Sequence, residues 1–309
     1  MKKFLLFLFV LIALIYFTDC NKEMSVENSN TTVVTPPHSV DSLYYVDSLV
    51  LYDYDVSGNI TDSLFYKYQY DSRKRLVLIS ETDPGGSTWD YITLNYNGTD
   101  TLPYMFREID SSFSFSGAAY DTLFRYFTYN SQGKKIKDSS VEFLYLYTAP
   151  YYTVRNYTYS GNTVTSSGWE GQNSNPALAT ALNLDTAIII SNGDIISAIS
   201  YQSVSGNPYQ KYFDTHLTYD TKKTPEYASS WKNIGYKVPS YEYIYNEHTP
   251  FNNVVHTYQY NYLTSSILFD DYVLNITYNN QDLPVTAYYS STPNNLGIYS
   301  KAVFKYKRM

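Results

Sequence analysis

The stretch Phe127-Thr128-Tyr129-Asn130-Ser131-Gln132-Gly133-Lys134-Lys135-Ile136 predicts the fold of this chain. Its alternation of aromatic and polar residues places the two rings on one face of a β-strand and the threonine on the other. Asn130 and Gly133 tolerate positive φ angles and supply a turn, after which Ile136 begins a return strand. The stretch is therefore predicted to be the centre of a β-hairpin.

The same pattern recurs along the chain at intervals of about 30 residues, which is typical of a repeat protein. The copies are Tyr52–Ile60, Tyr68–Leu76, Leu94–Gly98, Phe127–Ile136, Tyr157–Val164, Leu217–Pro225, Tyr243–Asn246, Tyr258–Asn261, Ile276–Pro284 and Phe304–Tyr306. We call the tyrosine in the second aromatic slot the anchor tyrosine. The anchor tyrosines are Tyr70, Tyr96, Tyr129, Tyr159, Tyr219, Tyr245, Tyr278 and Tyr306. One long gap is filled by Ile188–Ile195, which has the same shape with isoleucine in the aromatic slots.

About nine hairpins imply roughly 16–20 strands, and an open sheet rarely exceeds about 10 strands without curling or splitting. We therefore expect an all-β fold, a large antiparallel meander that is barrel-like or flattened. Because a tyrosine ring is apolar and its hydroxyl is polar, we expect rows of tyrosines on the interior face. A short helical insertion is predicted only at Pro176–Leu182.

The composition excludes two classes of protein. Aromatic residues make up 18% of the 309 residues, including 38 tyrosines, and charged residues only 17%. A disordered chain would be poor in aromatic residues, and a helical bundle would be poor in tyrosine. The net charge is −7 and the sequence holds no long basic block, so nucleic acid is not an expected partner.

The N-terminus predicts export. Lys2 and Lys3 precede an uninterrupted apolar run, Phe4–Phe17, which is too short for a transmembrane helix and matches the apolar core of a secretory signal. The only cysteine, Cys20, follows this run and resembles the lipid-attachment cysteine of bacterial lipoproteins. The residue before it, Asp19, departs from the small residue of that family. An uncleaved anchor and an ordinary signal peptide with an incidental thiol are the alternatives.

We accordingly divide the chain into a signal peptide (residues 1–19), a lipid-anchored flexible tether (20–40) and one Tyr-rich β-repeat domain (41–309). The tether is polar and carries Pro36 and Pro37 near its end.

The repeat resembles a known family. The residues that carry the likeness are Tyr68–Leu76, Phe127–Ile136, Leu217–Pro225, Ile276–Thr286 and Val303–Lys307. Their pattern resembles the YD/RHS repeat and, more closely, the uncharacterised Bacteroidetes lipoproteins that have a DUF4595-like domain with a porin-like fold. This resemblance implies an outer-membrane, lipid-anchored, all-β protein without an assigned reaction. Asn21–Glu23 resembles the tag that directs such lipoproteins to the cell surface. Several turns lack the glycine of the repeat.

The sequence holds no convincing catalytic or metal-binding constellation. Its four histidines show no metal-ligand spacing, and no Gly-x-Ser-x-Gly motif occurs, so we predict a protein that is not an enzyme and has no cofactor.

Two sets of residues are candidate sites for binding or modification. The tryptophans Trp89, Trp169 and Trp231 are candidates for stacking on sugar rings, and simple packing beside tyrosines is the alternative. Asp-Ser or Asp-Thr followed by a mostly aliphatic residue resembles the O-glycosylation acceptor of Bacteroidetes secreted proteins, and ordinary strand-start chemistry is the alternative. The acceptors would be Ser42, Ser48, Ser63, Thr101, Thr122 and Thr186.

The sequence favours a non-enzymatic, envelope-anchored lipoprotein that binds or scaffolds a glycan or another envelope protein. An integral outer-membrane β-barrel is the second hypothesis, and a hydrolase with a dispersed site is the third.

Overall fold

The computed structural model describes residues 44–110, 121–131, 133–144, 149–189, 194–224, 252–291 and 298–309. Within these ranges it holds sixteen antiparallel strands and one short 3-10 helix, η1. The signal peptide, the tether with Cys20, the acceptor Ser42, Tyr245 and Trp231 lie outside the described residues. The strands are β1 (Tyr44–Tyr54), β2 (Ile60–Tyr70), β3 (Leu76–Thr82), β4 (Thr88–Asn95), β5 (Met105–Asp110), β6 (Asp121–Tyr129), β7 (Lys135–Phe143), β8 (Tyr151–Ser160), β9 (Thr163–Gly171), β10 (Ala181–Ile189), β11 (Ile195–Val204), β12 (Gln210–Lys223), β13 (Asn252–Asn261), β14 (Ser266–Tyr278), β15 (Pro284–Ser291) and β16 (Ile298–Arg308).

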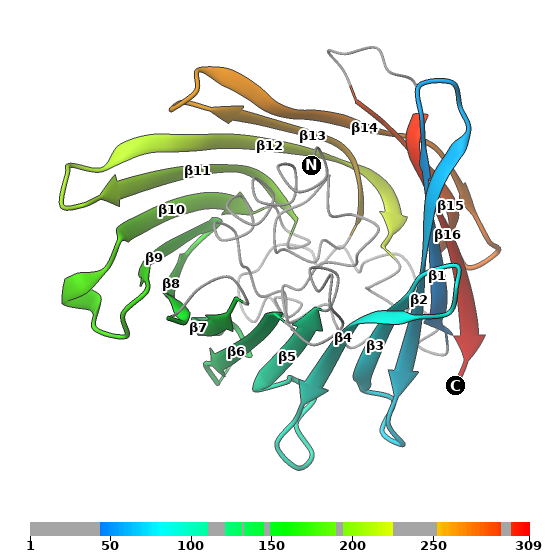
Figure 1. Ribbon diagram of the computed structural model, residues 1–309, viewed down its shortest axis with the longest axis horizontal. Helices are drawn as coiled ribbons and strands as arrows, with labels where there is room; N and C mark the ends of the chain where they lie inside the picture. The colour runs from blue at the N-terminus through cyan, green and yellow to red at the C-terminus, as the bar shows by residue number, and fades with distance from the viewer. Residues whose placement is uncertain are drawn as a thin grey trace, which may run out of the picture.

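The strands form a closed barrel in which every strand pairs with its neighbours in sequence (Figure 1). The ring closes where β1 pairs with β16, from Tyr44 opposite Arg308 to Asp53 opposite Ser300. This result confirms the large antiparallel meander and decides between its two predicted forms in favour of the barrel. The predicted insertion is confirmed as one turn, η1 at Pro176–Leu178, which is capped by the Asn175 side chain.

The repeat places its rings as predicted in most copies. Phe127 and Tyr129 belong to the packed interior and Thr128 is exposed. The copies at Tyr68–Tyr70, Tyr157–Tyr159, Leu217–Tyr219 and Phe304–Tyr306 follow the same rule, with an exposed polar residue between two core residues. Residues on one face of a strand alternate with those on the other, so the copies share one register relative to the interior.

Two partial copies contradict this expectation. In β13 the amide of Gln259 is buried, and Tyr258 and Tyr260 lie on the other face. In the second half of β1 the buried residues are Leu49 and Leu51, so Tyr52 lies on the outer face. Both copies lie on odd-numbered strands, and a bulge in β1 between Val46 and Ser48 resets its alternation. A slip of one residue moves every side chain to the opposite face, which is why these rings point away from the interior.

The turns use the predicted chemistry. In the turn after β6, the Asn130 side chain accepts a hydrogen bond from the Lys134 amide, and Gly133 has a φ of 73°. Corresponding turns follow β2 and β14, where Lys74 and Asp282 hold the positive φ without being glycine. The aspartate or asparagine that starts each turn therefore maintains the hairpin where the glycine is missing.

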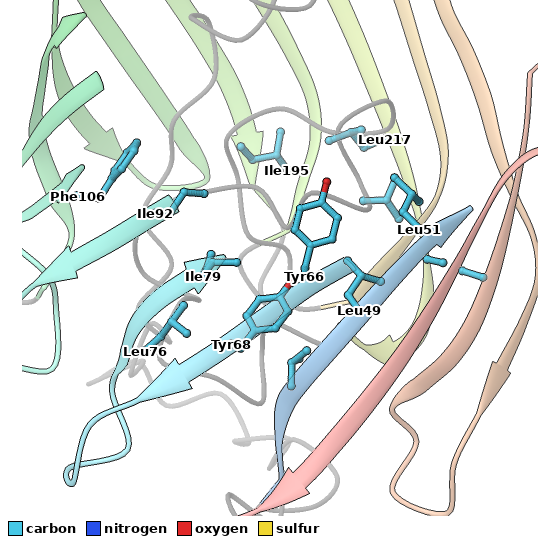
Figure 2. Close-up of a cluster of buried hydrophobic side chains, with 14 of the residues drawn as sticks. Leu49, Leu51, Tyr66, Tyr68, Leu76, Ile79, Ile92, Phe106, Ile195 and Leu217 are labelled. Atoms are coloured by element: carbon cyan, nitrogen blue, oxygen red, sulfur yellow. The ribbon is translucent and has the colours of Figure 1, made fainter. Parts of the chain in front are cut away.

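The interior is one continuous apolar cluster that unites strands from all around the ring (Figure 2). It contains Leu49 of β1, Tyr68 of β2 and Phe106 of β5, and it extends to Ile195 of β11 and Leu217 of β12. These residues all lie on the inner face of the sheet, and the cluster continues from each strand to its neighbours around the ring. Among the described residues, no helix is long and apolar enough to cross a membrane.

Candidate functional site: a polar wall inside the barrel

The inner surface of the barrel has two contrasting regions. We call the buried apolar residues on the inner face of β15, β16 and β1–β5 the apolar wall, which includes Ala287, Phe304, Leu49, Tyr68 and Ile92. The inward-facing residues of β6–β11 form the polar wall. Its members are Arg125, Lys135, Asp138, Arg155, Ser166, Glu170, Asn183, Asp185, Ser200 and Gln202.

The first part of the polar wall is a charged cluster on β6 and β7. Arg125 Nε donates to Asp138 at 2.8 and 2.9 Å, and Lys135 Nζ lies 3.2 Å from the same carboxylate. The Lys135 ammonium is also 5.3 Å from the ring centres of both Phe127 and Tyr157. Although burial opposes a charged carboxylate, the two cations hold the pKa of Asp138 below its usual value.

The second part is an ion pair that spans a strand. Arg155 on β8 donates from Nη1 to Asp185 Oδ2 on β10 at 2.7 Å, so its side chain crosses β9. The residue opposite Arg155 on β9 is Gly168, where a Cβ atom would lie 1.9 Å from the Val154 carbonyl oxygen. Ser166 on the same strand donates to Asp185 at 2.7 Å. Glycine is therefore required at position 168 for the close approach of the β8 backbone, on the strand that the Arg155 side chain crosses.

Burial raises the pKa of Asp185, against the opposing effect of the Arg155 charge. Burial also raises the pKa of Glu170, which lies beside Tyr151 and Asn183. Gln202 Nε2 donates to both Glu170 Oε1 and Asn183 Oδ1 at 3.3 Å. The polar wall therefore continues from the ion pair toward the end of the barrel at which β9 finishes.

Four buried polar side chains, Glu170, Asn183, Asp185 and Ser200, lie on the three adjacent strands β9–β11. They bond mainly to one another and to close neighbours, Ser200 to Asp185 and both Asn183 and Tyr151 to Glu170. Buried polar groups are costly unless they are paired, and native proteins hold few unpaired ones. The cluster places donors and acceptors together on one part of the inner face, which suits a polar molecule.

Glu142 extends the polar wall on β7. Its carboxyl is largely buried, and burial together with the negative charge of Asp121 raises its pKa to about 7. This carboxyl can therefore change its protonation state near neutral pH.

The anchor tyrosines serve a different purpose. At one end of the barrel, each described anchor tyrosine except Tyr278 donates its hydroxyl to a backbone carbonyl at or near the start of the preceding strand. The pairs are Tyr70 with Val46, Tyr96 with Leu76, Tyr129 with Pro103, Tyr159 with Lys135, Tyr219 with Ile195 and Tyr306 with Pro284. We call this the latch end, and the other the opposite end. The latch end also contains Tyr44 and Met309, the two limits of the described barrel.

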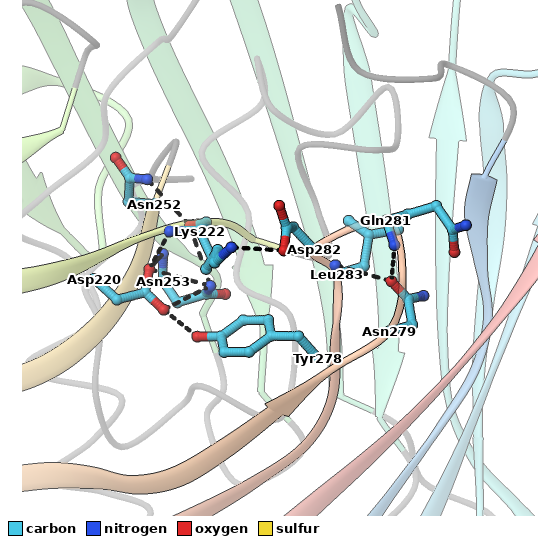
Figure 3. A network of polar contacts seen from close by, with 9 residues as sticks. All are labelled: Asp220, Lys222, Asn252, Asn253, Tyr278, Asn279, Gln281, Asp282 and Leu283. Carbon is cyan, nitrogen blue, oxygen red and sulfur yellow. Dashed lines mark hydrogen bonds and ion pairs between the residues drawn. The ribbon is translucent and has the colours of Figure 1, made fainter. Parts of the chain in front are cut away.

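Tyr278 is the exception, because its hydroxyl donates to the Asp220 carboxylate (Figure 3). The same carboxylate accepts from the Asn253 side chain, and Lys222 Nζ lies 2.6 Å from Asp282. These contacts join β12, β13 and the turn after β14 at the latch end.

The structure does not bring the predicted stacking residues together. Trp89 lies on β4 and Trp169 on β9, both near the opposite end but five strands apart in the ring. Trp169 is half-buried on the outer face between Val154 and Leu182. Among the predicted glycosylation acceptors with described positions, Thr101 is exposed in a loop, and Ser48, Ser63, Thr122 and Thr186 are half-buried on strands.

The described part of the chain does not assemble a metal site or a catalytic triad. No group of three or more His, Cys, Asp or Glu side chains among the described residues is arranged to hold a metal ion. Ser166 bonds Asp185, yet the third member of this group is Arg155 and not a histidine. His216 is exposed beside Asp214 on the outer face.

Sequence reasoning missed the polar wall, although a signal was present. Arg155 stands two residues before Tyr157, so the alternation that places Tyr157 inside also places Arg155 inside. The same alternation on β10 places Asn183, Asp185 and Ala187 on one face. A charged residue in phase with the aromatic rings was therefore the available clue.

Comparison with known proteins supports the fold. No protein-family model matches the chain, and no curated protein matches its sequence. The barrel is similar to the crystal structure of a porin-like protein from Bacteroides vulgatus, with a TM-score of 0.50 and 10% identity over 86% of this chain and 99% of the other. It also matches a porin-like protein from Bacteroides uniformis, with a TM-score of 0.43 and 11% identity over 85% of this chain and 96% of the other. At this identity the first likeness shows a porin-like fold.

Proposed function

We propose that this chain is a non-enzymatic binding protein of the bacterial envelope, anchored to the outer membrane by a lipid at Cys20. The observation that carries the binding role is the cluster of buried polar side chains Glu170, Asn183, Asp185 and Ser200. A ligand that both donates and accepts hydrogen bonds satisfies such a mixed set, and a glycan has this chemistry in its hydroxyl groups. The polar wall thus takes the role that the sequence suggested for the tryptophans.

The buried ion pair of the polar wall also supports a binding role. Replacing such a pair by apolar residues is often neutral or stabilising, so the pair Arg155–Asp185 is not explained by stability alone. A wall of fixed charges and amides inside a barrel is, however, suited to orienting a polar ligand.

The test of the binding role compares two serines that are equally buried. Ser200 on the polar wall is 0% exposed and Ser300 on β16 is 1% exposed. A glycan array should reveal a ligand for the wild-type chain, and Ser200→Ala and Asn183→Ala should weaken its binding about tenfold or more. Ser300→Ala should leave the affinity within about twofold. Equal losses for Ser200→Ala and Ser300→Ala would contradict a site on the polar wall, and no ligand on the array would contradict the glycan assignment.

The anchor is tested separately. Cells that express the full chain should incorporate radiolabelled palmitate into it, and Cys20→Ala should abolish the label. An unlabelled wild-type chain would refute the lipoprotein proposal.

The residues on the outer face argue against an integral outer-membrane barrel. Lipid-facing strands carry an apolar band about 25 Å tall, and charged side chains on it are destabilising. Here the outer face carries exposed Lys67, Arg107 and Lys137 on β2, β5 and β7. We expect the Cys20→Ala chain to remain in solution in buffer without detergent after removal of residues 1–19. Recovery only in detergent would favour the integral barrel.

A further inference from the structure

The charges of the barrel are separated along its axis. Odd-numbered strands begin at the latch end and even-numbered strands finish there. Exposed cations lie within four residues of that end on several strands and turns. They are Lys67, Arg73, Lys74, Lys137, Lys305 and Arg308. Toward the opposite end, Lys211 and Lys301 are half-buried, Arg155 is buried in its ion pair, and exposed Arg107 lies midway along the short strand β5.

The opposite end is acidic on its inner surface. Carboxylates face each other directly across neighbouring strands, and charges of like sign so placed repel one another. The directly opposed pairs are Asp53 with Asp62, Glu81 with Asp90, Asp90 with Asp110 and Asp110 with Asp121. The barrel therefore carries positive charge toward one end and negative charge toward the other.

Several of the described acidic groups at the latch end are paired with cations, whereas Asp100 in the loop after β4 is exposed. Asp47 lies 3.1 Å from Lys67 and 3.3 Å from Lys307, and Asp71 pairs with Arg75. Lys305 and Arg308 on β16 are exposed, and Lys74 Nζ donates to the main-chain oxygen of Met309 beside them. A surplus of positive charge thus gathers where β16 ends.

The chain enters the barrel at the same place. Tyr44, the first described residue, pairs with Arg308. Cys20 precedes it by 24 residues. A random-coil segment of 24 residues would span roughly 25–30 Å, so the proposed lipid at Cys20 would keep the barrel near the membrane without fixing which end faces it.

We infer that the latch end is a docking surface for the anionic lipid headgroups of the membrane to which the chain is anchored. Clusters of lysine and arginine are attracted to anionic lipid surfaces over about one Debye length, roughly 8 Å at physiological salt. The acidic opposite end is repelled by the same surface. The barrel consequently stands with its latch end on the membrane and its opposite end directed away. This orientation rests on the proposed lipid anchor, whereas the docking surface itself can be tested without lipid on the protein.

The experiment uses the mature chain with Cys20→Ala, which keeps the tether and the barrel. Co-sedimentation is measured with vesicles of about 30% phosphatidylglycerol in phosphatidylcholine and with vesicles of phosphatidylcholine alone. We expect binding to the anionic vesicles only, and loss of that binding in about 0.5 M NaCl. Equal binding to both vesicles, or none to either, would overturn the inference.

A matched pair of variants locates the surface. Lys301 and Lys305 lie on the same strand and the same face, four residues apart and toward opposite ends of the barrel. Lys305→Gln with Arg308→Gln should lower the vesicle partition coefficient about tenfold. Lys211→Gln with Lys301→Gln should change it by less than about twofold, and thermal melting verifies that both doubles fold. Equal loss from the two doubles would overturn the inference. So would displacement from the vesicles by about 5 mM inorganic phosphate at constant ionic strength, because it would indicate a site for free phosphate.

Discussion

The apolar and polar walls face the same interior, but they are held together by different forces. Leu49 of the apolar wall is 0% exposed and lies between Phe304 and Tyr66 on the neighbouring strands. Its contribution comes from removing apolar surface from water, which is non-directional and insensitive to salt and pH. Arg155 and Asp185 of the polar wall depend on each other, because each charge would be strongly unfavourable if buried alone. One repeat can therefore build either wall, depending on which residues occupy its inward positions.

The largest effect is expected from breaking the ion pair of the polar wall. Asp185→Ala leaves the Arg155 guanidinium buried without its carboxylate, and the free energy of unfolding should fall by about 3–5 kcal/mol. Chemical denaturation measures this loss. The double variant Arg155→Met with Asp185→Leu should recover most of it, since it removes both charges. Equal instability of the single and double variants would show that packing, and not charge pairing, governs this wall.

The corresponding change on the apolar wall is Leu49→Ala. Truncation of a fully buried leucine should lower the free energy of unfolding by about 2–4 kcal/mol through lost transfer energy and the cavity left behind. Denaturation at low and high salt should give the same loss. A loss that varies with salt would mean that the two walls are not energetically distinct.

Glu142 should give the polar wall a pH dependence that the apolar wall lacks. Its pKa rises from an ordinary value of 4.5 to about 7 in the folded chain, so the folded state binds the proton more tightly than the unfolded state. The resulting stability is fully present below pH 4.5 and is lost as the pH rises through 7. It amounts to about 3 kcal/mol at most.

Glu142→Gln removes this titration. The free energy of unfolding of the variant should therefore rise relative to that of the wild type as the pH increases from about 4.5 to 8. Denaturation midpoints across that range measure it, and Leu49→Ala is the control that should shift all midpoints equally. A constant difference between Glu142→Gln and the wild type would refute the raised pKa.

The smallest effect concerns the anchor tyrosines, which are shared by both walls. Tyr306→Phe at the edge of the apolar wall and Tyr159→Phe beside the polar wall each remove one hydrogen bond to a backbone carbonyl. Each should lower the free energy of unfolding by about 1 kcal/mol. Thermal melting of the two variants compares them directly. If only one of the two variants loses stability, the anchor hydroxyls do not contribute equally to the two walls.

Much of the fold could be predicted from local sequence. The alternation around Phe127 and Tyr129 predicted strands and their inward rings, and Asn130 predicted the turn that follows. These features depend on neighbours within about ten residues, so a pattern along the chain is sufficient to read them. The stacking role of Trp89 and Trp169 stays a prediction, and the structure adds only that they lie on strands far apart in the ring.

The candidate site was not predicted because the role of each of its residues depends on contacts with other strands. Asp185 appeared in the sequence as part of an Asp-Thr motif, and its role follows from Arg155 two strands away and from the missing side chain of Gly168 between them. A contact between residues 30 positions apart leaves no local signal.

Strand alternation and turn chemistry are short-range properties of the chain, so its construction from Tyr-rich hairpins can be read from the sequence. Closure of the meander cannot, since it depends on the pairing of β1 with β16 from the two ends of the domain. The inward positions at Leu51 and Gln259 also follow from the assembled sheet, because register with neighbouring strands overrules the local aromatic pattern. The division of the interior into two walls, and of the barrel into a basic and an acidic end, follows from that closure and register.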